Sequence, residues 1–272
     1  MKIIDFTKMA GAGNDFILVD NRSGALGKNA ARLAKKLCDR KRSIGADGLI
    51  LLEKPQAAKK ADVRMRIMNP DGSEAPMCGN GVRCLAKFAA DRGIARHRLS
   101  IETLAGMIYA DVKGERVKAR MVEPTDLKLN FEIRVRGRKE RLNFVNTGVP
   151  HAVKMVDFVS RCDVDGLGAA IRRHPYFAPH GANVDFVSLR KDGALDVRTY
   201  ERGVEGETLA CGTGSTAAAL VFAAQKNLKS PVLVYTKSGE TLKIYFSRAG
   251  IGFFGVYLEG RIIKTFEGSA AL

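Results

Sequence analysis

Two cysteines occupy the same eight-residue pattern at separate points of the chain. Residues 74–81 read EAPMCGNG and residues 207–214 read ETLACGTG, so Glu-x-x-x-Cys-Gly-x-Gly occurs twice. A run of small and apolar residues follows each octet and predicts a helix that begins directly after the cysteine. Because the amide groups at a helix start carry partial positive charge, they stabilise a thiolate and lower its pKa. Each octet therefore predicts an activated thiol, Cys78 or Cys211, beside glycine amides that can bind an anion.

Two activated thiols on matching scaffolds favour acid–base chemistry over the alternatives. A redox pair is typically a CxxC motif, which the sequence lacks. A metal site would need more ligands than two thiols and four scattered histidines supply. Inversion of a stereocentre, in contrast, requires a base on one face of the carbon and an acid on the other, and the reverse reaction exchanges their roles. We therefore expect no metal, and we expect Cys78 and Cys211 to face each other across a cleft between two similar domains.

The other three cysteines, Cys38, Cys84 and Cys162, lack the glycine frame of the octets. An odd total of five cysteines without a CxxC pair argues against a disulfide framework, so reduced thiols are expected. A cysteine outside a reactive setting usually packs as a small apolar residue. We predict that these three are buried core residues.

The duplication continues in the elements that must hold the octets. Strand-like segments at 63–69 and 195–201 precede the two octets. After each predicted helix comes a strand-like run and then Thr-x-x-Gly, at 103–106 and 236–239. Agreement of octet, helix, strand and turn in the same order indicates two copies of one architecture.

A further pair of segments extends the comparison. GNDFILVD (13–20) resembles ANVDFVSL (182–189), since each has an asparagine-containing turn that leads into a strand. Strand-like runs outnumber helices, and strand and helix do not alternate often enough for a doubly wound sheet. We predict an α+β fold of two pseudo-symmetric domains, each a curved, mostly antiparallel sheet around a central helix. The predicted domains are 1–122, completed by 259–272, and 123–258.

The composition is that of a globular protein, with 46% hydrophobic and 27% charged residues among 272. The formal net charge of +16 raises the alternative of a basic nucleic-acid-binding module. Because the basic residues are dispersed and no nucleic-acid-binding motif accompanies them, we interpret the charge as a solvated surface. The first residues do not form a signal peptide, and no apolar run is long enough to span a membrane. We expect a cytoplasmic protein with no membrane or nucleic-acid partner.

The sequence resembles the diaminopimelate epimerases, which interconvert LL- and meso-2,6-diaminopimelate without a cofactor. The segments that carry the resemblance are GAGNDF, GADG, NPDGSEAPMCGNGVRC, PHAV, GANVDF, YERG and ETLACGTG, and they span nearly the whole chain. The related proline racemases share the two-cysteine plan, but they have histidine where this chain has Asn80. A proline or hydroxyproline racemase or epimerase of the same fold is the alternative.

The resemblance implies a role for each matching position. Cys78 and Cys211 match the acid–base pair, and no cofactor or metal is implied. The positions that match carboxylate-binding groups at the two helix starts are Gly79, Asn80, Gly212 and Thr213. Those that match other substrate-binding groups are Asn14, Asn69, Asn183, Glu201 and Arg202, and those that match groups tuning the thiol pKa values are His151 and Glu201. The resemblance further implies diaminopimelate as the small-molecule substrate, a homodimer as one assembly, and a place in lysine and peptidoglycan precursor biosynthesis.

Several positions depart from the family pattern. Many members have asparagine before Pro-His, where this chain has Val149, and some have glutamine at the position of Gly48. Ala10 stands where a polar residue is frequent, and the segment YERGVEGET is one residue longer than in some members. We expect one polar contact to the substrate to be missing or replaced.

Overall fold

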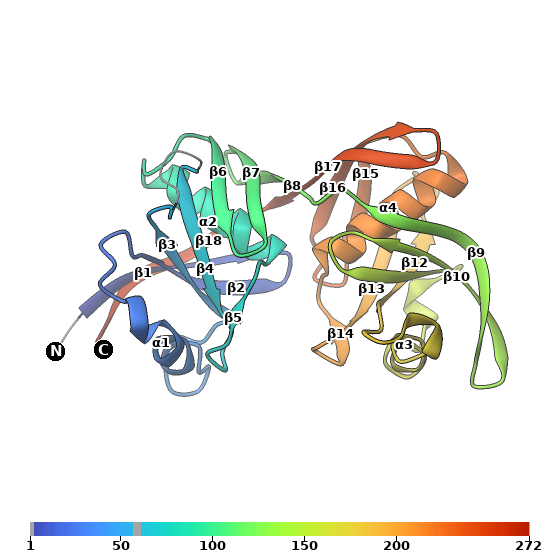
Figure 1. The fold of residues 1–272 in the computed structure, drawn as a ribbon, viewed down its shortest axis with the longest axis horizontal. Coiled ribbons are helices and arrows are strands. Elements are labelled where there is room, and N and C mark those ends of the chain that lie inside the picture. The colour runs from blue at the N-terminus through green and yellow to red at the C-terminus, as the bar shows by residue number, and fades with distance from the viewer. Residues whose placement is uncertain (1–2, 57–60, 272) are drawn as a thin grey trace. The chain divides into compact units, whose positions relative to one another are not determined.

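The computed structural model describes residues 3–56 and 61–271. By its internal contacts the chain divides into two compact units: unit 1 comprises Met1–Ala119 and Gly260–Leu272, and unit 2 comprises Arg120–Glu259. Each unit is a mostly antiparallel sheet around one central helix (Figure 1). The predicted α+β class with two similar halves is confirmed.

Unit 1 has the strand order β18–β1–β2–β3–β4–β6–β7–β8, and the short strand β5 pairs with the other end of β4. Among its described pairings, β2–β3 and β4–β6 are parallel and the rest are antiparallel. The strands are β1 (Ile3–Gly11), β2 (Asn14–Asp20), β3 (Gly48–Glu53), β4 (Val63–Met68), β5 (Glu74–Ala75), β6 (Arg98–Thr103), β7 (Gly106–Lys113), β8 (Arg116–Arg120) and β18 (Ile263–Ala271). The helices are η1 (Gly27–Asn29), α1 (Ala30–Leu37) and the central α2 (Gly79–Asp91).

Unit 2 repeats this arrangement with the order β9–β10–β11–β12–β13–β15–β16–β17, and β14 pairs with the other end of β13. Here β11–β12 and β13–β15 are the parallel pairs among the described strands. The strands are β9 (Thr125–Val135), β10 (Arg138–Asn146), β11 (Pro150–Met155), β12 (Asn183–Leu189), β13 (Leu195–Glu201), β14 (Gly206–Thr208), β15 (Val232–Thr236), β16 (Thr241–Ala249) and β17 (Gly252–Arg261). The helices are η2 (Val159–Arg161), α3 (Val164–Arg172), η3 (Pro175–Phe177) and the central α4 (Gly212–Lys226).

The pairing order aligns the two units element by element. The strands predicted before the octets are β4 and β13, and the predicted Thr-x-x-Gly turns follow β6 and lie between β15 and β16, as expected. The predicted match of 13–20 with 182–189 is wrong. Segment 13–20 contains β2, whose counterpart is β11, because each precedes a peripheral helix and a parallel strand. Segment 182–189 contains β12, the counterpart of β3. An asparagine turn before a strand is a local signal, whereas the place of a strand in a sheet depends on distant partners.

The register of the parallel pairs identifies equivalent positions. The first pair of the β2–β3 ladder contains Phe16, and the first pair of the β11–β12 ladder contains His151. Phe16 and His151 are therefore equivalent positions. Counting along β3 and β12 from these pairs makes Ile50 the counterpart of Asp185.

The segment 258–267 near the end of the chain contains parts of two strands. That stretch divides at Ile262, whose buried side chain and backbone bond to the Glu115 carbonyl separate β17 from β18. Strand β18 pairs with β1 in the sheet of unit 1.

The cores form because alternate residues of a strand face opposite sides of its sheet. In β3, Ile50 and Leu52 pack in the cluster around α2, whereas Leu49 and Leu51 pack in the cluster around α1. Burial of such a side chain contributes about 1.5–3 kcal/mol. In unit 2 the same alternation turns Asp185 toward α4, because its neighbours in β12 pack against α3.

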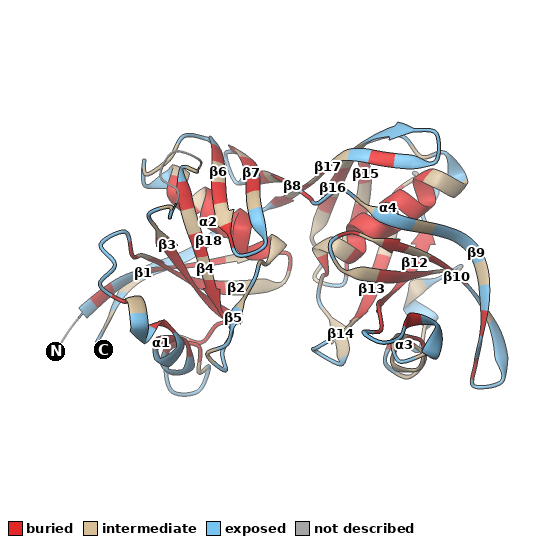
Figure 2. Cartoon of the chain, in the orientation of Figure 1, coloured by how far each residue is buried: buried red, intermediate tan, exposed pale blue. Residues whose placement is uncertain are grey.

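The central helices are the most enclosed elements of the units. Figure 2 shows buried residues along both, and α4 is buried without a break from residue 214 to 223. A helix that is apolar on all sides is one that a sheet surrounds. Among the described residues, no helix has both the length and the apolar character needed to cross a bilayer.

Candidate active site

Both octet cysteines lie directly before a central helix. Cys78 precedes α2 and Cys211 precedes α4, with extended backbone dihedrals φ/ψ of −140°/122° and −120°/115°. The predicted helix starts are therefore confirmed. At this position a side chain lies beside the first amide groups of the helix, which have no acceptor within the helix itself.

The last glycine of each octet allows the helix to approach the sheet closely. A Cβ atom on Gly81 would lie 3.1 Å from Ile50 and 3.2 Å from Ile67, and one on Gly214 would lie 2.2 Å from the Asp185 carboxylate. Any other residue would move the helix start, and the cysteine with it, away from the sheet. The same glycine thus faces apolar side chains in unit 1 and a carboxylate in unit 2.

The surroundings of Cys211 raise the pKa of its thiol well above the usual value. Burial is the largest cause, and the nearby Glu201 and Asp185 carboxylates act in the same direction. The Gly214 amide donates to Sγ at 3.4 Å, and the Thr213 hydroxyl lies 3.3 Å from Sγ. Both contacts oppose this shift but do not reverse it. The expected lowering of the Cys211 pKa by the helix start is therefore wrong, because desolvation and two carboxylates outweigh it. Cys211 is a protonated thiol at neutral pH.

A chain of hydrogen bonds joins Cys211 to a buried histidine. Thr213 Oγ1, beside Cys211 Sγ, also lies 3.0 Å from His151 Nε2. His151 Nδ1 lies 2.7 Å from Asp185 Oδ2, and both side chains are fully buried. The carboxylate favours the tautomer with the proton on Nδ1, so Nε2 accepts from the threonine hydroxyl. A proton can therefore pass between Cys211 and His151 through Thr213.

Two further threonines hold this chain in place. Thr199 Oγ1 donates to the second carboxylate oxygen of Asp185 at 2.8 Å. Thr147 Oγ1 donates to the Thr213 carbonyl at 3.1 Å. Because Thr147, Asp185 and Thr199 are buried, each bond also removes the cost of leaving one of their polar atoms without a partner.

Glu201 is the second acidic group near Cys211. Burial raises the pKa of its carboxyl above the usual value, although hydrogen bonds from Thr208 and Cys211 oppose the shift. The Thr208 hydroxyl donates to Glu201 Oε1 at 2.6 Å. The side chain is thus fixed at the end of β13 on the side of the thiol.

Asn183 and Arg202 are linked to each other and to the histidine. Asn183 Oδ1 accepts from the Arg202 amide at 2.7 Å, and Asn183 Nδ2 lies 3.3 Å from His151 Nε2. The Arg202 guanidinium donates to the His180 carbonyl at 3.4 Å. Unit 2 therefore gathers six of the predicted residues around one helix start: Cys211, Thr213, His151, Asn183, Glu201 and Arg202.

Cys78 has a different setting at the same backbone position. It is half-buried and packs against the apolar cluster around α2. The counterparts of His151 and Asp185 are Phe16 and Ile50, and both belong to that cluster. The acid–histidine pair therefore has no equivalent at these two positions of unit 1.

Unit 1 instead has a directed chain of hydrogen bonds through two asparagines. The buried Arg83 guanidinium donates to Asn80 Oδ1, and Asn80 Nδ2 donates to Asn14 Oδ1 at 2.7 Å. Asn14 Nδ2 then donates to Asp47 Oδ2 at 3.0 Å. A guanidinium only donates and a carboxylate only accepts, so the orientation of both amides is determined. Among the described residues, each of the two asparagine amides donates one hydrogen bond, so its second N–H can donate to an acceptor on a ligand.

Asp47 is itself held by a cluster of charged groups. Arg40 Nη2 lies 2.7 Å from Asp47 Oδ1 and 2.6 Å from Asp15 Oδ1, and Lys8 Nζ lies 2.8 Å from Asp15 Oδ2. Burial alone would raise the pKa of Asp15, but Arg40 and Lys8 hold it far below the usual range. The Asp15 carboxylate therefore stays ionised at any pH at which the protein functions.

Asn69 is the predicted residue with the most local role in the fold. Its side-chain amide donates to the Ser73 hydroxyl at 2.9 Å. Its backbone carbonyl accepts from the Gly72 backbone amide at 2.9 Å, and the two bonds close the turn between β4 and β5. The pairings Met68–Glu74 and Tyr200–Glu207 make Asn69 the counterpart of Glu201.

The sequence model of the diaminopimelate epimerase family matches residues 6–126 and 143–252. A diaminopimelate epimerase of Hydrogenobaculum sp. (strain Y04AAS1) is 44% identical over 96% of this chain and 96% of its own length. Those of Aquifex aeolicus and Archaeoglobus fulgidus are 43% and 41% identical, each over 97% of this chain and 97% and 95% of their own lengths. This chain belongs to the diaminopimelate epimerase family.

Solved structures with little sequence identity share the fold. A Bacillus anthracis phenazine biosynthesis protein of the PhzF family has a TM-score of 0.77 at 18% identity, with both chains fully covered. A hydroxyproline epimerase from Agrobacterium vitis has a TM-score of 0.70 at 18% identity, over 99% of this chain and 93% of that one. These likenesses show the fold alone.

Several residues of the site were not predicted from the sequence of this diaminopimelate epimerase family member. They are Asp185, Thr199, Thr147 and Thr208 in unit 2, and Arg83, Asp47 and Arg40 in unit 1. Asp185 and Asp47 lie inside the motifs GANVDF and GADG, so the motifs contained a signal for them. Thr208 likewise lies inside the octet ETLACGTG. Thr199 and Thr147 lie outside the motifs, and only the sheet pairing brings them to the helix start.

The remaining cysteines follow the prediction in part. Cys38 and Cys84 are buried, and burial raises the pKa of Cys38 to about 11. Cys162 is only half-buried, because it lies at the edge of the α3 cluster, where its thiol donates to the Phe158 carbonyl at 3.6 Å. None of the five cysteines, all in described residues, forms a disulfide. In the part of the chain that the structure describes, no group of three or more metal-binding side chains occurs.

Proposed function

We propose that this chain interconverts LL- and meso-2,6-diaminopimelate by a two-base mechanism in which Cys78 and Cys211 act on opposite faces of one carbon. The observation that carries the proposal is the duplicated placement of a cysteine directly before a central helix, with the same glycine frame, in two matching units. Family membership supplies the substrate and the isomerase activity. The reaction belongs to lysine biosynthesis.

The resting protonation states in this proposal are assigned from the surroundings of Cys211. Cys211 is protonated, because burial and two carboxylates raise its pKa. Cys78 is then the thiolate that breaks the Cα–H bond and takes the proton, while the electron pair stays on carbon. Cys211 gives its proton to the opposite face of that carbon. The reverse reaction starts from the opposite protonation state.

The negative charge that develops beside the carbanion needs donors already in place. The α-carboxylate would accept hydrogen bonds from the helix starts at Gly79–Asn80 and Gly212–Thr213, where amide groups are oriented and carry partial positive charge. The remaining N–H of Asn80 suits a carboxylate oxygen, since Arg83 fixes its orientation. These donors stabilise the transition state without reorganising.

The distal amino-acid end of the substrate carries a carboxylate and an ammonium, so the protein needs both donors and acceptors to bind it. Arg202 would bind the distal carboxylate, since a guanidinium presents a planar pair of donors. Asn14, Asn69, Asn183 and Glu201 would provide the other distal contacts, with amide and carboxylate oxygens for the ammonium. Val149 in unit 2 is the counterpart of Asn14 in unit 1. Many family members have asparagine at the position of Val149, so this chain lacks that side-chain amide.

Between turnovers the thiols must return to their starting protonation state. The Thr213–His151–Asp185 chain offers a route for Cys211, because Nε2 accepts a proton while Asp185 stabilises the resulting cation. His151 and Glu201 thus tune the thiol, the first through Thr213 and the second through its charge. We further propose a cytoplasmic enzyme whose partner is its small-molecule substrate, and a homodimer as its assembly.

Deuterium incorporation tests the two-base assignment. In heavy water, meso-diaminopimelate formed early from the LL isomer should carry one deuterium at the inverted carbon, because Cys211 has exchanged with solvent before the substrate binds. The unreacted LL isomer should stay largely protiated, since Cys78 can only return the hydrogen that it removed. Mass spectrometry of both isomers at low conversion measures this. Substantial transfer of the substrate's own hydrogen into the product would indicate a single base and refute the scheme.

A further inference from the structure

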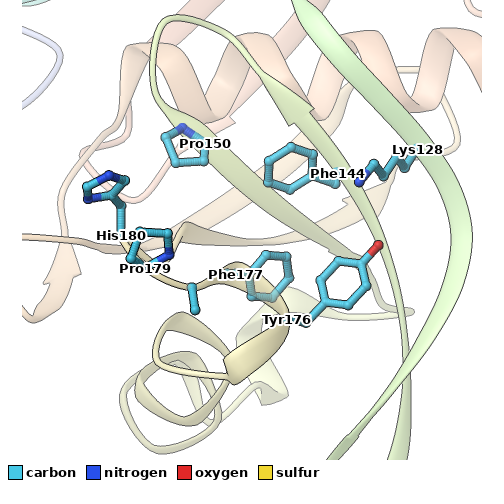
Figure 3. A pocket seen from close by; sticks show the side chains of 9 residues that line it. Lys128, Phe144, Pro150, Tyr176, Phe177, Pro179 and His180 are labelled. Carbon is cyan, nitrogen blue, oxygen red and sulfur yellow. The ribbon is translucent and has the colours of Figure 1, made fainter.

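Unit 2 contains an open pocket of about 200 Å³ that none of the predicted catalytic or substrate-binding residues line. It lies between β9, β10 and the segment that follows α3 (Figure 3). Its lining residues are Lys128, Phe144, Pro150, Tyr176, Phe177, Ala178, Pro179, His180 and Gly181.

The counterpart of this region in unit 1 contains charged side chains that pair with one another. From the equivalence of Phe16 and His151, Pro150 corresponds to Asp15 and Phe144 corresponds to Lys8. In unit 1 these positions hold the charged cluster in which Lys8 and Arg40 bind Asp15. Unit 2 has replaced the ion cluster with aromatic and proline side chains and left a space.

The walls of the pocket are aromatic and ordered by ring contacts. The Phe144 and Phe177 rings are stacked, with centroids 5.9 Å apart at 19°, and Tyr176 meets Phe177 edge to face at 5.1 Å. Phe131 stacks on the outer side of Tyr176 at 4.7 Å. These contacts fix the rings of the wall relative to one another.

A single cation lies among these rings. Lys128 Nζ is 5.9 Å from the Phe144 centroid and 5.7 Å from the Tyr176 centroid. No ion pair of Lys128 occurs among the described residues, in contrast to Lys139 of the same hairpin, which lies 3.3 Å from Glu132. Aromatic walls alone would suit a cationic ligand, but Lys128 already occupies that place and would repel one.

We propose that this pocket binds a small aromatic carboxylate, with the ring against the side chains of Phe144, Phe177 and Pro179 and the carboxylate on Lys128. The volume suits one ring, since an apolar cavity of about 150 Å³ accepts benzene. The single lysine suits a single negative charge. A ligand there would contact Pro150 and Gly181, next to the segments that carry His151 and Asn183, so the site is adjacent to the candidate active site without sharing its side chains.

Titration of the full chain with benzoate, followed by isothermal calorimetry, tests the proposal. We expect saturable binding with a Kd on the order of 1 mM, the range for a ligand of this size. The variant Lys128→Met keeps the apolar stem and removes the charge, so it should weaken benzoate binding about tenfold, the loss expected for one charged contact. Lys139→Met, on the same hairpin but outside the pocket, is the matched control and should bind benzoate as the unaltered chain does.

Ligands of the same shape but different charge complete the test. Toluene should bind more weakly than benzoate and should not respond to Lys128→Met, and benzylammonium should not bind. The proposal is overturned if benzoate fails to saturate at about ten times the expected Kd, if Lys128→Met and Lys139→Met bind it equally, or if benzylammonium binds as tightly as benzoate. Circular dichroism establishes that both variants are folded, and each lysine is solvent-exposed, so neither substitution disturbs a core.

Discussion

Units 1 and 2 hold their cysteines on the same backbone and surround them with opposite chemistry. Around Gly214 lie a carboxylate and a hydroxyl, from Asp185 and Thr199, whereas around Gly81 lie the methyl groups of Ile50 and Ile67. The polar groups of unit 1 are beside the helix start instead, in the chain from Arg83 through Asn80 and beyond.

The comparison separates two requirements of a two-base reaction. Positioning requires symmetry, because both thiols must reach the same carbon from equivalent scaffolds. Proton affinity requires asymmetry, because one thiol must start with a proton and the other without. In the proposed mechanism the duplicated octets would meet the first requirement. Burial and the carboxylates of unit 2, which raise the pKa of Cys211, would meet the second. The following predictions test each half of this division.

Removal of either thiol should have the largest effect. We expect Cys78→Ala and Cys211→Ala each to lower kcat about a thousandfold or more, because each removes one of the two proton-transfer groups. Conversion of LL to meso isomer measures this, and circular dichroism reports the fold. If either folded variant keeps near wild-type turnover, the two units do not act as a pair.

Conversion of the unit 2 network to its unit 1 counterpart should be the next most severe change. His151→Phe leaves Asp185 buried without its main partner and should destabilise the protein by about 3 kcal/mol, with a loss of roughly a hundredfold in kcat. The triple variant His151→Phe, Asp185→Ile, Thr199→Ile carries the apolar residues of unit 1 throughout. It should regain most of the stability, since a buried polar network can be replaced by apolar groups as a set.

Denaturant unfolding and steady-state kinetics distinguish the two roles of the network. The triple variant should remain as slow as His151→Phe alone. Recovery of activity together with stability would show that the network only supports the fold and does not serve Cys211.

A smaller effect is expected from the asparagine chain of unit 1. Asp47→Asn is nearly isosteric but places an amide donor opposite the Asn14 amide, so the orientation of Asn14 and Asn80 is no longer determined. We expect KM to rise about tenfold with a smaller change in kcat, since one ligand contact of about 1.4 kcal/mol is lost. The control is Asp39→Asn in the same loop, whose Oδ1 accepts from the Lys41 and Arg42 backbone amides and keeps that ability as an amide oxygen. Equal KM values for both variants would contradict the directed chain.

The smallest effect is expected at Glu201, because the buried charge that the proposed mechanism uses lowers the stability of the fold. Because burial raises its pKa, this group stabilises the fold fully only below its usual pKa of 4.5, and the contribution is lost as the pH rises through the folded value. At pH 7 the buried carboxylate is therefore unfavourable, and Glu201→Gln should stabilise the protein by about 1 kcal/mol. The gain should disappear near pH 4, where the wild-type group is protonated. Urea unfolding at the two pH values measures this, and a gain independent of pH would exclude the titration of Glu201 as its cause.

The parts of the site that the sequence predicted are those set by short segments. The strand, turn, cysteine and helix of each copy follow one another directly, so their order and boundaries could be predicted from residues 63–106 and 195–239. The match of 13–20 with 182–189 failed because it depended on which strands pair, and pairing joins residues that are far apart in the chain. The threonines around Asp185 were missed for the same reason, since no local pattern distinguishes them from other strand residues.

The sequence by itself determined where the two thiols lie: an extended cysteine before a helix, with glycines that allow close packing, is specified within eight residues. Only the tertiary structure decided how those thiols differ. The pKa of Cys211 depends on its burial and on carboxylates from β12 and the end of β13, and the apolar setting of Cys78 depends on strands of the other sheet. Desolvation and charge act through space, so two nearly identical octets carry different proton affinities once each is enclosed by its own unit.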